Sequence, residues 1–128
     1  MDCIFCKIIN KEISSNTIYE DDVVKVFMDA NPVSDGHLLV VPKVHYTDIN
    51  DIPIDVITHI QEVAKNMFKL LKDKLNIDGL TLTQNNEYGQ AIKHYHLHLI
   101  PRYKDDKIDF IHSHTRSNIN DVYKKISE

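Results

Sequence analysis

The sequence contains no long hydrophobic run and no surplus of positive charge. Its longest apolar stretches, such as residues 38–41, are far too short to span a bilayer. The 15 lysines and arginines stand against 19 acidic residues, for a formal net charge of −4, so no overall cationic field is available to hold a nucleic-acid backbone. The first residues also lack a signal-peptide pattern, because Asp2 replaces the basic region and Lys7 interrupts the apolar stretch. We therefore expect a cytoplasmic protein that binds neither membrane nor nucleic acid.

Cysteine is scarce as well, since Cys3 and Cys6 are the only two in the chain. Such a pair is not expected to form a structural disulfide in a reducing compartment, so a metal-binding or redox role is the better interpretation. The chain also has no internal repeat, no low-complexity tract and no linker rich in Gly, Pro or Ser. Its 128 residues suit one domain with one core.

Hydrophobic patterning predicts an α+β fold, in which a single antiparallel β-sheet packs against one long helix. The expected strands comprise residues 17–20, 23–28, 37–41, 80–83 and 91–100. The first two strands form a hairpin, and the last two form an antiparallel pair. Short helices are expected near the ends of the chain, at residues 4–9 and 118–127.

The long helix is expected to begin after Asp51 as N-cap, with Pro53 in its first turn. Apolar residues from Val56 to Leu71 recur at three- and four-residue steps, which predicts one core-facing stripe. Gly79 lies just beyond the expected end of the helix.

Three of the eight histidines alternate within five residues, as His94, His96 and His98. In a strand these three share one face, whereas Tyr95 and Leu97 share the other and are expected in the core. The outer two histidines lie about 13 Å apart at ideal strand geometry. One atom cannot be held by all three, but a substrate with several phosphoryl oxygens can meet at least two. A merely polar outer face and a metal site built from this strand alone are the alternatives.

Imidazole suits nucleophilic chemistry at neutral pH. Its unperturbed pKa, about 6.5, leaves a large neutral fraction at pH 7. The ring nitrogen can attack phosphorus, and the resulting phosphorus–nitrogen bond is labile to water. Neighbouring imidazoles can donate hydrogen bonds to phosphoryl oxygen or protonate a leaving group.

Residues 94–100, His-Tyr-His-Leu-His-Leu-Ile, match the His-x-His-x-His-apolar-apolar signature of the histidine triad superfamily. Residues 3–9 resemble the N-terminus of its bacterial-type nucleotide-binding branch, and residues 36–45 resemble its Gly-His-apolar-Pro-Lys-x-His segment. The resemblance covers residues 1–104 as a histidine triad domain. Residues 105–128 form a C-terminal tail that belongs to the same domain or to its edge.

The resemblance implies a compact α+β homodimer that binds a purine nucleotide. Family members hydrolyse or transfer a nucleoside monophosphate through a nucleotidyl-histidine intermediate. In this chain His96 matches the nucleophile, and His98 matches the residue that contacts the α-phosphate or the leaving group. Asp29 matches the acidic residue that binds the ribose hydroxyls, and His37 matches a histidine that supports the triad from behind.

The loop before the triad departs from the family pattern. Asn85 matches the turn asparagine near the phosphate, but the turn to Gly89 is about two residues short, so Asn85 and Asn86 compete for that role. Gln90 belongs either to the nucleotide-binding phosphate loop or to a structural turn. Ala91 stands where many relatives carry a hydroxyl residue that bonds phosphate.

Cys3 and Cys6 have the spacing at which two thiolates can bind one tetrahedral metal ion. Such an ion requires two further ligands. The resemblance supplies these from a distance, because His45 and His94 match the ligands of zinc-containing members. His94 would then anchor the segment that carries His96. An unmetallated thiol pair and a redox-active pair are the alternatives.

The leading functional hypothesis is a hydrolase that cleaves at the α-phosphate of purine nucleoside phosphoramidates or related adenylates. Within the family, the alternative is a dinucleoside polyphosphate hydrolase. Two other classes are a nucleotide-binding regulatory module with little turnover and a metal-handling protein that uses its histidines for transition ions.

Overall fold

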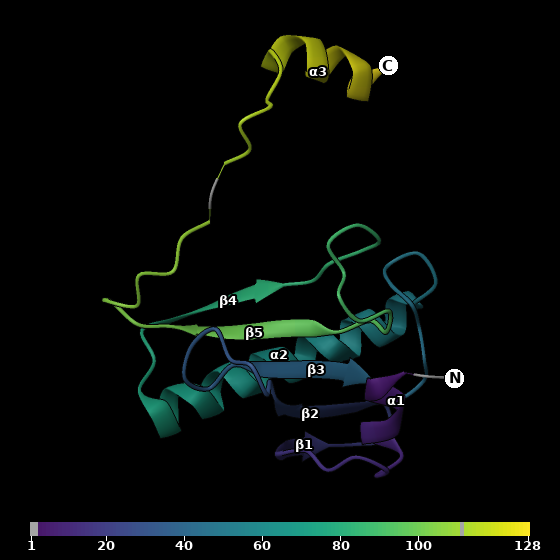
Figure 1. The fold of residues 1–128 in the computed structure, drawn as a ribbon, viewed down its shortest axis with the longest axis vertical. Helices are drawn as coiled ribbons and strands as arrows, with labels where there is room; N and C mark the ends of the chain where they lie inside the picture. Colours follow the sequence, from purple (N-terminus) through teal and green to yellow (C-terminus); the bar gives the residue numbers. More distant parts are fainter. Residues whose placement is uncertain (1–2, 111) are drawn as a thin grey trace.

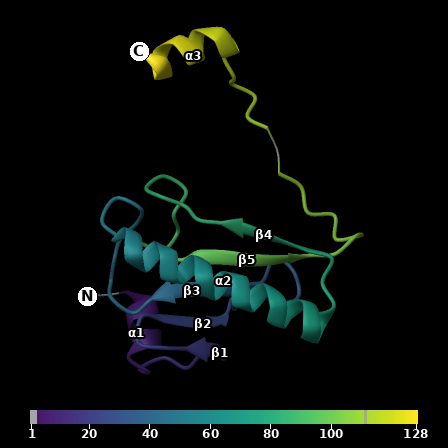
Figure 2. The same cartoon turned by 180° about the vertical axis from the view of Figure 1, so that it is seen from behind.

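The computed structural model describes residues 3–110 and 112–128. At its centre is one antiparallel sheet in the strand order β1-β2-β3-β5-β4. The strands are β1 (Thr17–Glu20), β2 (Val24–Met28), β3 (Leu38–Pro42), β4 (Gly79–Thr83) and β5 (Leu97–Arg102). The helices are α1 (Ile4–Ile9), α2 (Ile54–Leu75) and α3 (Ile119–Ser127). Helix α2 runs along one face of the sheet and α1 lies against the other (Figures 1 and 2). The α+β fold predicted from the sequence is confirmed.

Each face of the sheet buries an apolar cluster. On one face, the predicted stripe of α2 packs against β2, β3 and β5, and Tyr95 and Leu97 are buried there as expected. On the other face, Phe5 and Ile8 of α1 pack against the opposite side chains of β2 and β3, which include Phe27. Both clusters draw on the same strands because successive side chains point to opposite faces. The second cluster holds α1 at the end of the sheet where the histidines gather.

The predicted ends of the long helix need correction. Helix α2 begins at Ile54 with Pro53 as its N-cap, and Asp51 does not cap it. The Asp51 carboxylate instead accepts hydrogen bonds from the backbone N–H groups of Thr47 and Asp48, so it closes the preceding loop. At the other end, Asn76 adopts the left-handed conformation with φ 54°, so Asn76 and not Gly79 ends the helix in this conformation.

The strand predicted at residues 91–100 is wrong in its first half, because β5 begins only at Leu97 and extends through Pro101 to Arg102. Pairing with β3 stops at Val40 opposite Leu97. Further along, β3 reaches Pro42, which has no N–H for a ladder, and its carbonyl accepts a hydrogen bond from His94 Nε2 (2.8 Å) instead. Residues 91–96 are therefore a loop, and only His98 of the three histidines lies in a strand.

Beyond β5, residues 103–110 leave the sheet, and residues 112–118 lead into α3, which lies well away from the rest of the molecule (Figures 1 and 2). We call residues 103–128 the C-terminal arm. The Asn118 side chain caps α3, and none of its residues is buried. The expected helix at 118–127 is thus confirmed. None of the helices within residues 3–110 and 112–128 is long and apolar enough to cross a membrane.

Candidate active site and metal centre

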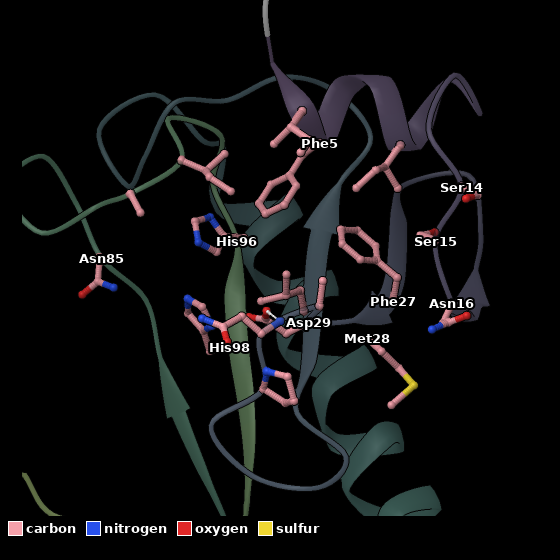
Figure 3. A pocket seen from close by; sticks show the side chains of 18 of the residues that line it. Phe5, Ser14, Ser15, Asn16, Phe27, Met28, Asp29, Asn85, His96 and His98 are labelled. Carbon is pink, nitrogen blue, oxygen red and sulfur yellow. Dashed lines mark hydrogen bonds and ion pairs between the residues drawn. The ribbon is translucent and has the colours of Figure 1, made fainter.

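A cavity of about 820 Å³ opens beside α1, the end of β2 and the loop before β5. Figure 3 shows Phe5 and Phe27 on its apolar side, with His96 and His98 along one wall. The predicted site residues Asp29 and Asn85 also line it. The remaining lining includes the apolar or small residues Ile4, Ile8, Met28, Ala30, Pro32, Leu39, Gly89, Ala91 and Ile92, and the polar residues Ser14, Ser15, Asn16 and Asn31.

His96 is almost fully buried, and its ring is held in one tautomer. Its Nδ1 lies 2.7 Å from the carbonyl oxygen of His94, and because a carbonyl only accepts, Nδ1 carries the proton. Burial lowers the pKa of His96, against smaller opposing effects of that hydrogen bond and of Asp29. The ring is therefore neutral at pH 7, with its lone pair on Nε2.

His98 is polarised from behind by His37. The backbone N–H of Val33 donates to His37 Nδ1 (3.0 Å), which leaves the His37 proton on Nε2, 3.0 Å from His98 Nδ1. His98 thus accepts at Nδ1 and keeps its own proton on Nε2. Burial first, then His96 and His37, lower the pKa of His98 to about 4. His98 is consequently a neutral N–H donor.

Asp29 lies beside these two histidines, with Oδ2 at 3.5 Å from His37 Nε2 and 3.9 Å from His98 Nδ1. The Asp29 carboxylate and the two imidazoles are also close enough together to be ligands of a single metal ion. However, the Val33 N–H requires the lone pair of His37 on Nδ1, so His37 Nε2 holds a proton where a metal needs a lone pair. We therefore assign His37 and His98 as a hydrogen-bonded pair, with the Asp29 carboxylate close beside them.

The polar residues of the loop before β5 have different roles: one lines the cavity and two make hydrogen bonds within and between loops. Asn85 faces the cavity (Figure 3), whereas Asn86 Oδ1 accepts the N–H of Ile49 (2.8 Å) and its side chain pairs with Gln84. The structure does not bring Gln90 into the cavity. Its side chain is buried and donates to the carbonyl of Thr47 (2.6 Å), which ties two loops together.

Cys3, Cys6, His45 and His94 form a four-residue cluster whose donor atoms all lie within 4.8 Å of one another. Cys3 Sγ is 3.3 Å from His94 Nδ1, and Cys6 Sγ is 3.3 Å from His45 Nδ1 and 3.5 Å from His94 Nδ1. A tetrahedral zinc ion with ordinary bond lengths would separate S and N ligands by about 3.6 Å. The four residues predicted as metal ligands are therefore positioned to bind a metal.

The tautomer of His94 also fits this role. Its Nε2 donates to the carbonyl of Pro42, so the lone pair is on Nδ1 and faces the two thiols. Burial lowers the pKa of His94 to about 4, which keeps the ring neutral as a ligand must be. His94 points into the cluster and away from the cavity, so the expected common face of three histidines reduces to His96 and His98, whose rings lie 4.9 Å apart.

Phe5 and Phe27 are functional candidates that the sequence reading missed. Both are buried in the cluster beneath α1, and both line the cavity. The only available signal was the position of Phe5 between the two cysteines, because nothing in the sequence shows that α1 folds over the histidines.

The fold and the cavity define a small α+β protein with a histidine-lined site for a ligand beside a Cys₂His₂ metal-ligand set. Residues 10–105 match the family model described as HIT domain. The chain therefore belongs to the HIT, or histidine triad, family.

Named relatives agree with this membership. A HIT-like protein of Methanocaldococcus jannaschii, described as uncharacterized, is 45% identical over 106 residues, which cover 81% of each chain. An adenosine 5′-monophosphoramidase of Saccharomyces cerevisiae is 38% identical over 85% of this chain and 67% of its own. The crystal structure of a Zn-bound histidine triad family protein from Mycobacterium smegmatis superposes with a TM-score of 0.82 at 31% identity, covering 91% of this chain and 86% of that one.

Proposed function

We propose that the protein hydrolyses purine nucleoside phosphoramidates or related adenylates at the α-phosphate, through a covalent nucleotidyl intermediate on His96. The observation that carries this proposal is the hydrogen bond from His96 Nδ1–H to the His94 carbonyl. It leaves a neutral nitrogen lone pair on a ring that lines the cavity. The phosphoramidase activity named for the yeast relative supports the same chemistry.

In the first step, His96 Nε2 attacks the α-phosphorus. A phosphorus–nitrogen bond to His96 forms while the bond to the leaving amine breaks, and the amine takes up a proton from water. The His98 Nε2–H is free to donate to a phosphoryl oxygen as negative charge builds there. In the second step, a water molecule attacks the same phosphorus and gives its proton to the hydroxide left by the first step. The bond between phosphorus and His96 Nε2 breaks, which releases the nucleoside monophosphate and restores the neutral His96 ring.

The charge of the cavity favours an amine over a polyphosphate as the leaving group. Among the described residues that line it, none is Lys or Arg, and Asp29 is the one carboxylate. The histidines add no positive charge, because burial lowers the pKa of both His96 and His98. A polyphosphate leaving group requires cationic partners, so dinucleoside polyphosphate hydrolysis is the weaker alternative.

We assign the other predicted residues by their positions. Asp29 binds the ribose hydroxyls with its carboxylate, Asn85 contacts the phosphate, and the base packs between the apolar side chains near Phe5 and Phe27. His37 positions His98. Gln90 acts as a structural clamp between loops, and not as a nucleotide ligand.

Zinc is the metal that we propose for Cys3, Cys6, His45 and His94, because two thiolates and two neutral imidazoles are a typical structural zinc set. The zinc-bound mycobacterial structure supports this choice. Two thiolates neutralise the ion, and the ion in turn fixes α1 and the loop before β5. We further propose that the enzyme works as a cytoplasmic homodimer.

The test is capture of the covalent intermediate. Wild-type protein, His96→Ala and the control His114→Ala, which changes an exposed histidine of the arm, are mixed with an α-³²P-labelled adenosine phosphoramidate and quenched without acid. Label is expected on wild-type protein and on His114→Ala, and none on His96→Ala. Turnover by His96→Ala at the wild-type rate would refute the covalent route.

A further inference from the structure

We propose that Phe5 is a positioning residue for His96 and transmits the state of the metal-ligand cluster to the nucleophile. The proposal rests on the function proposed above. It gives Phe5 a second role, besides forming part of the cavity wall.

Phe5 contacts one ring of the cavity, that of His96, and one ring of the metal-ligand cluster, that of His94. Its ring centroid is 5.0 Å from that of His96 at 80° and 6.0 Å from that of His94 at 77°. Both geometries are edge-to-face, which aromatic rings prefer over a stacked sandwich. Figure 3 shows the Phe5 ring between His96 and Phe27. Phe5 therefore joins a metal ligand, the nucleophile and the cavity wall in one packed cluster.

The cluster of thiols and imidazoles determines where Phe5 lies. Phe5 sits in α1 between Cys3, the N-cap, and Cys6. Both thiols contact His94 Nδ1, so an ion held by this set ties α1 to the segment that leads into β5. His96 then has two supports that move together, the carbonyl of His94 and the ring of Phe5.

The Phe5 contact matters because one hydrogen bond does not fix a ring. The bond at His96 Nδ1 sets the tautomer, but the ring can still tilt about that point and swing Nε2 away from the phosphorus. A ring packed edge-to-face against it, as Phe5 is, removes this freedom. Small misalignments of a nucleophile cost large factors in rate, so we expect Phe5 to act on kcat.

Phe27 supplies a matched control. It is as buried as Phe5, at 3% against 4% exposed, and both line the same cavity. The Phe27 ring packs edge-to-face on Phe5 at 5.6 Å, and among the described residues it makes no ring contact with a histidine of the site. Loss of either ring weakens the cavity wall, but only loss of Phe5 removes the support of His96.

The kinetic experiment compares wild type, Phe5→Leu and Phe27→Leu, each loaded with zinc and then stripped by a chelator in the presence of reductant. With adenosine 5′-phosphoramidate as substrate, stripping is expected to lower kcat about tenfold in wild type and Phe27→Leu, but only about twofold in Phe5→Leu. Equal losses in all three proteins, or no loss in wild type, would overturn the proposal.

A second measurement needs neither turnover nor metal removal. In the zinc-loaded proteins, the ring-proton resonance of His96 reports the ring current of Phe5. Phe5→Leu is expected to shift and broaden this resonance, and Phe27→Leu to leave it in place. Loss of the ring current alone shifts the resonance, so its width, which reports the mobility of the His96 ring, carries the test. A resonance in Phe5→Leu as narrow as in wild type would overturn the proposal even if stripped proteins unfold. If wild type hydrolyses nothing, the proposed function fails, whereas this spectrum still decides the role of Phe5.

Discussion

Backbone groups decide which nitrogen of each cavity histidine carries the proton. The His94 carbonyl forces the proton of His96 onto Nδ1, and the Val33 N–H forces the proton of His37 onto Nε2. The two cavity rings thereby present opposite functions, a lone pair on His96 and an N–H on His98. His96 receives its role directly from a backbone carbonyl, whereas His98 receives its role through His37, which is itself oriented by a backbone N–H.

Because burial lowers the pKa of His98 to about 4, stability should depend on pH in a defined window. The unfolded chain takes up this proton near pH 6.5 and the folded chain only near pH 4, so folding loses free energy as the pH falls between these values. The loss due to His98 should reach about 2 kcal/mol at pH 5. Urea unfolding of wild type and His98→Gln at pH 7.5 and 5 tests this, since the variant should lose about 2 kcal/mol less. Identical losses would contradict it.

Asn85 and Asn86 are expected to separate binding from stability. Asn85→Ala removes a group that faces the cavity, so it should weaken AMP binding about tenfold and leave the melting temperature nearly unchanged. Asn86→Ala removes the acceptor of the Ile49 N–H and should cost about 1–2 kcal/mol of folding free energy. Calorimetric titration with AMP and thermal unfolding of both variants measure this. Weaker binding only in Asn86→Ala would reverse the assignment.

At the scale of elements, periodicity predicted the helices and most strands because burial on one face leaves a repeat in the sequence. It failed where a side chain makes a hydrogen bond other than the one that its local pattern suggests. Asp51 looked like an N-cap, but it closes its own loop. Residues 91–96 alternate like a strand, yet His94 bonds Pro42 and the chain leaves the ladder. The Asp51 bonds are local but compete with a helix cap, whereas the bond between His94 and Pro42 joins residues about 50 positions apart, which no local pattern encodes.

In the candidate site too, the local sequence pattern predicted some features, and tertiary contacts determined the others. The histidine spacing and the Cys-x-x-Cys pair identified residues of both centres, because reactive side chains at short spacing are visible in a sequence. The placement of Gln90 outside the cavity was not visible, since its side chain bonds the carbonyl of Thr47. Likewise, the ring contacts of Phe5 depend on where α1 packs.

The metal-ligand cluster joins three elements, α1 and the two loops that carry His45 and His94. We expect about one zinc ion per chain in wild type. His45→Ala removes one of four ligands and should lose the ion to a mild chelator, whereas the arm variant His112→Ala, in an exposed histidine, should keep it. Elemental analysis after dialysis measures this, and circular dichroism monitors the fold. Several exchangeable ions per wild-type chain would favour a metal-handling protein.

The whole molecule consists of a packed body and a C-terminal arm. The body is stabilised by its buried clusters, whereas the end of the arm is exposed. The arm begins in an ordered way, because Arg102 bonds Asp106 through two nitrogens and lies over the Phe110 ring at 5.6 Å. Beyond it, α3 exposes apolar side chains at helical spacing, namely Ile119 (80%), Val122 (40%), Tyr123 (68%) and Ile126 (79%). A helix of nine residues is only marginally stable alone.

Removal of residues 111–128, the outer part of the arm, should therefore leave the body intact. A chain that ends at residue 110 keeps both apolar clusters and the contacts of Arg102, so its free energy of unfolding should change by less than about 1 kcal/mol in dilute solution. Urea unfolding of the full and shortened chains at several protein concentrations tests this. A larger loss at every concentration would mean that α3 packs on its own body. A loss that grows only with concentration would place its apolar face against a second copy, because association stabilises by mass action.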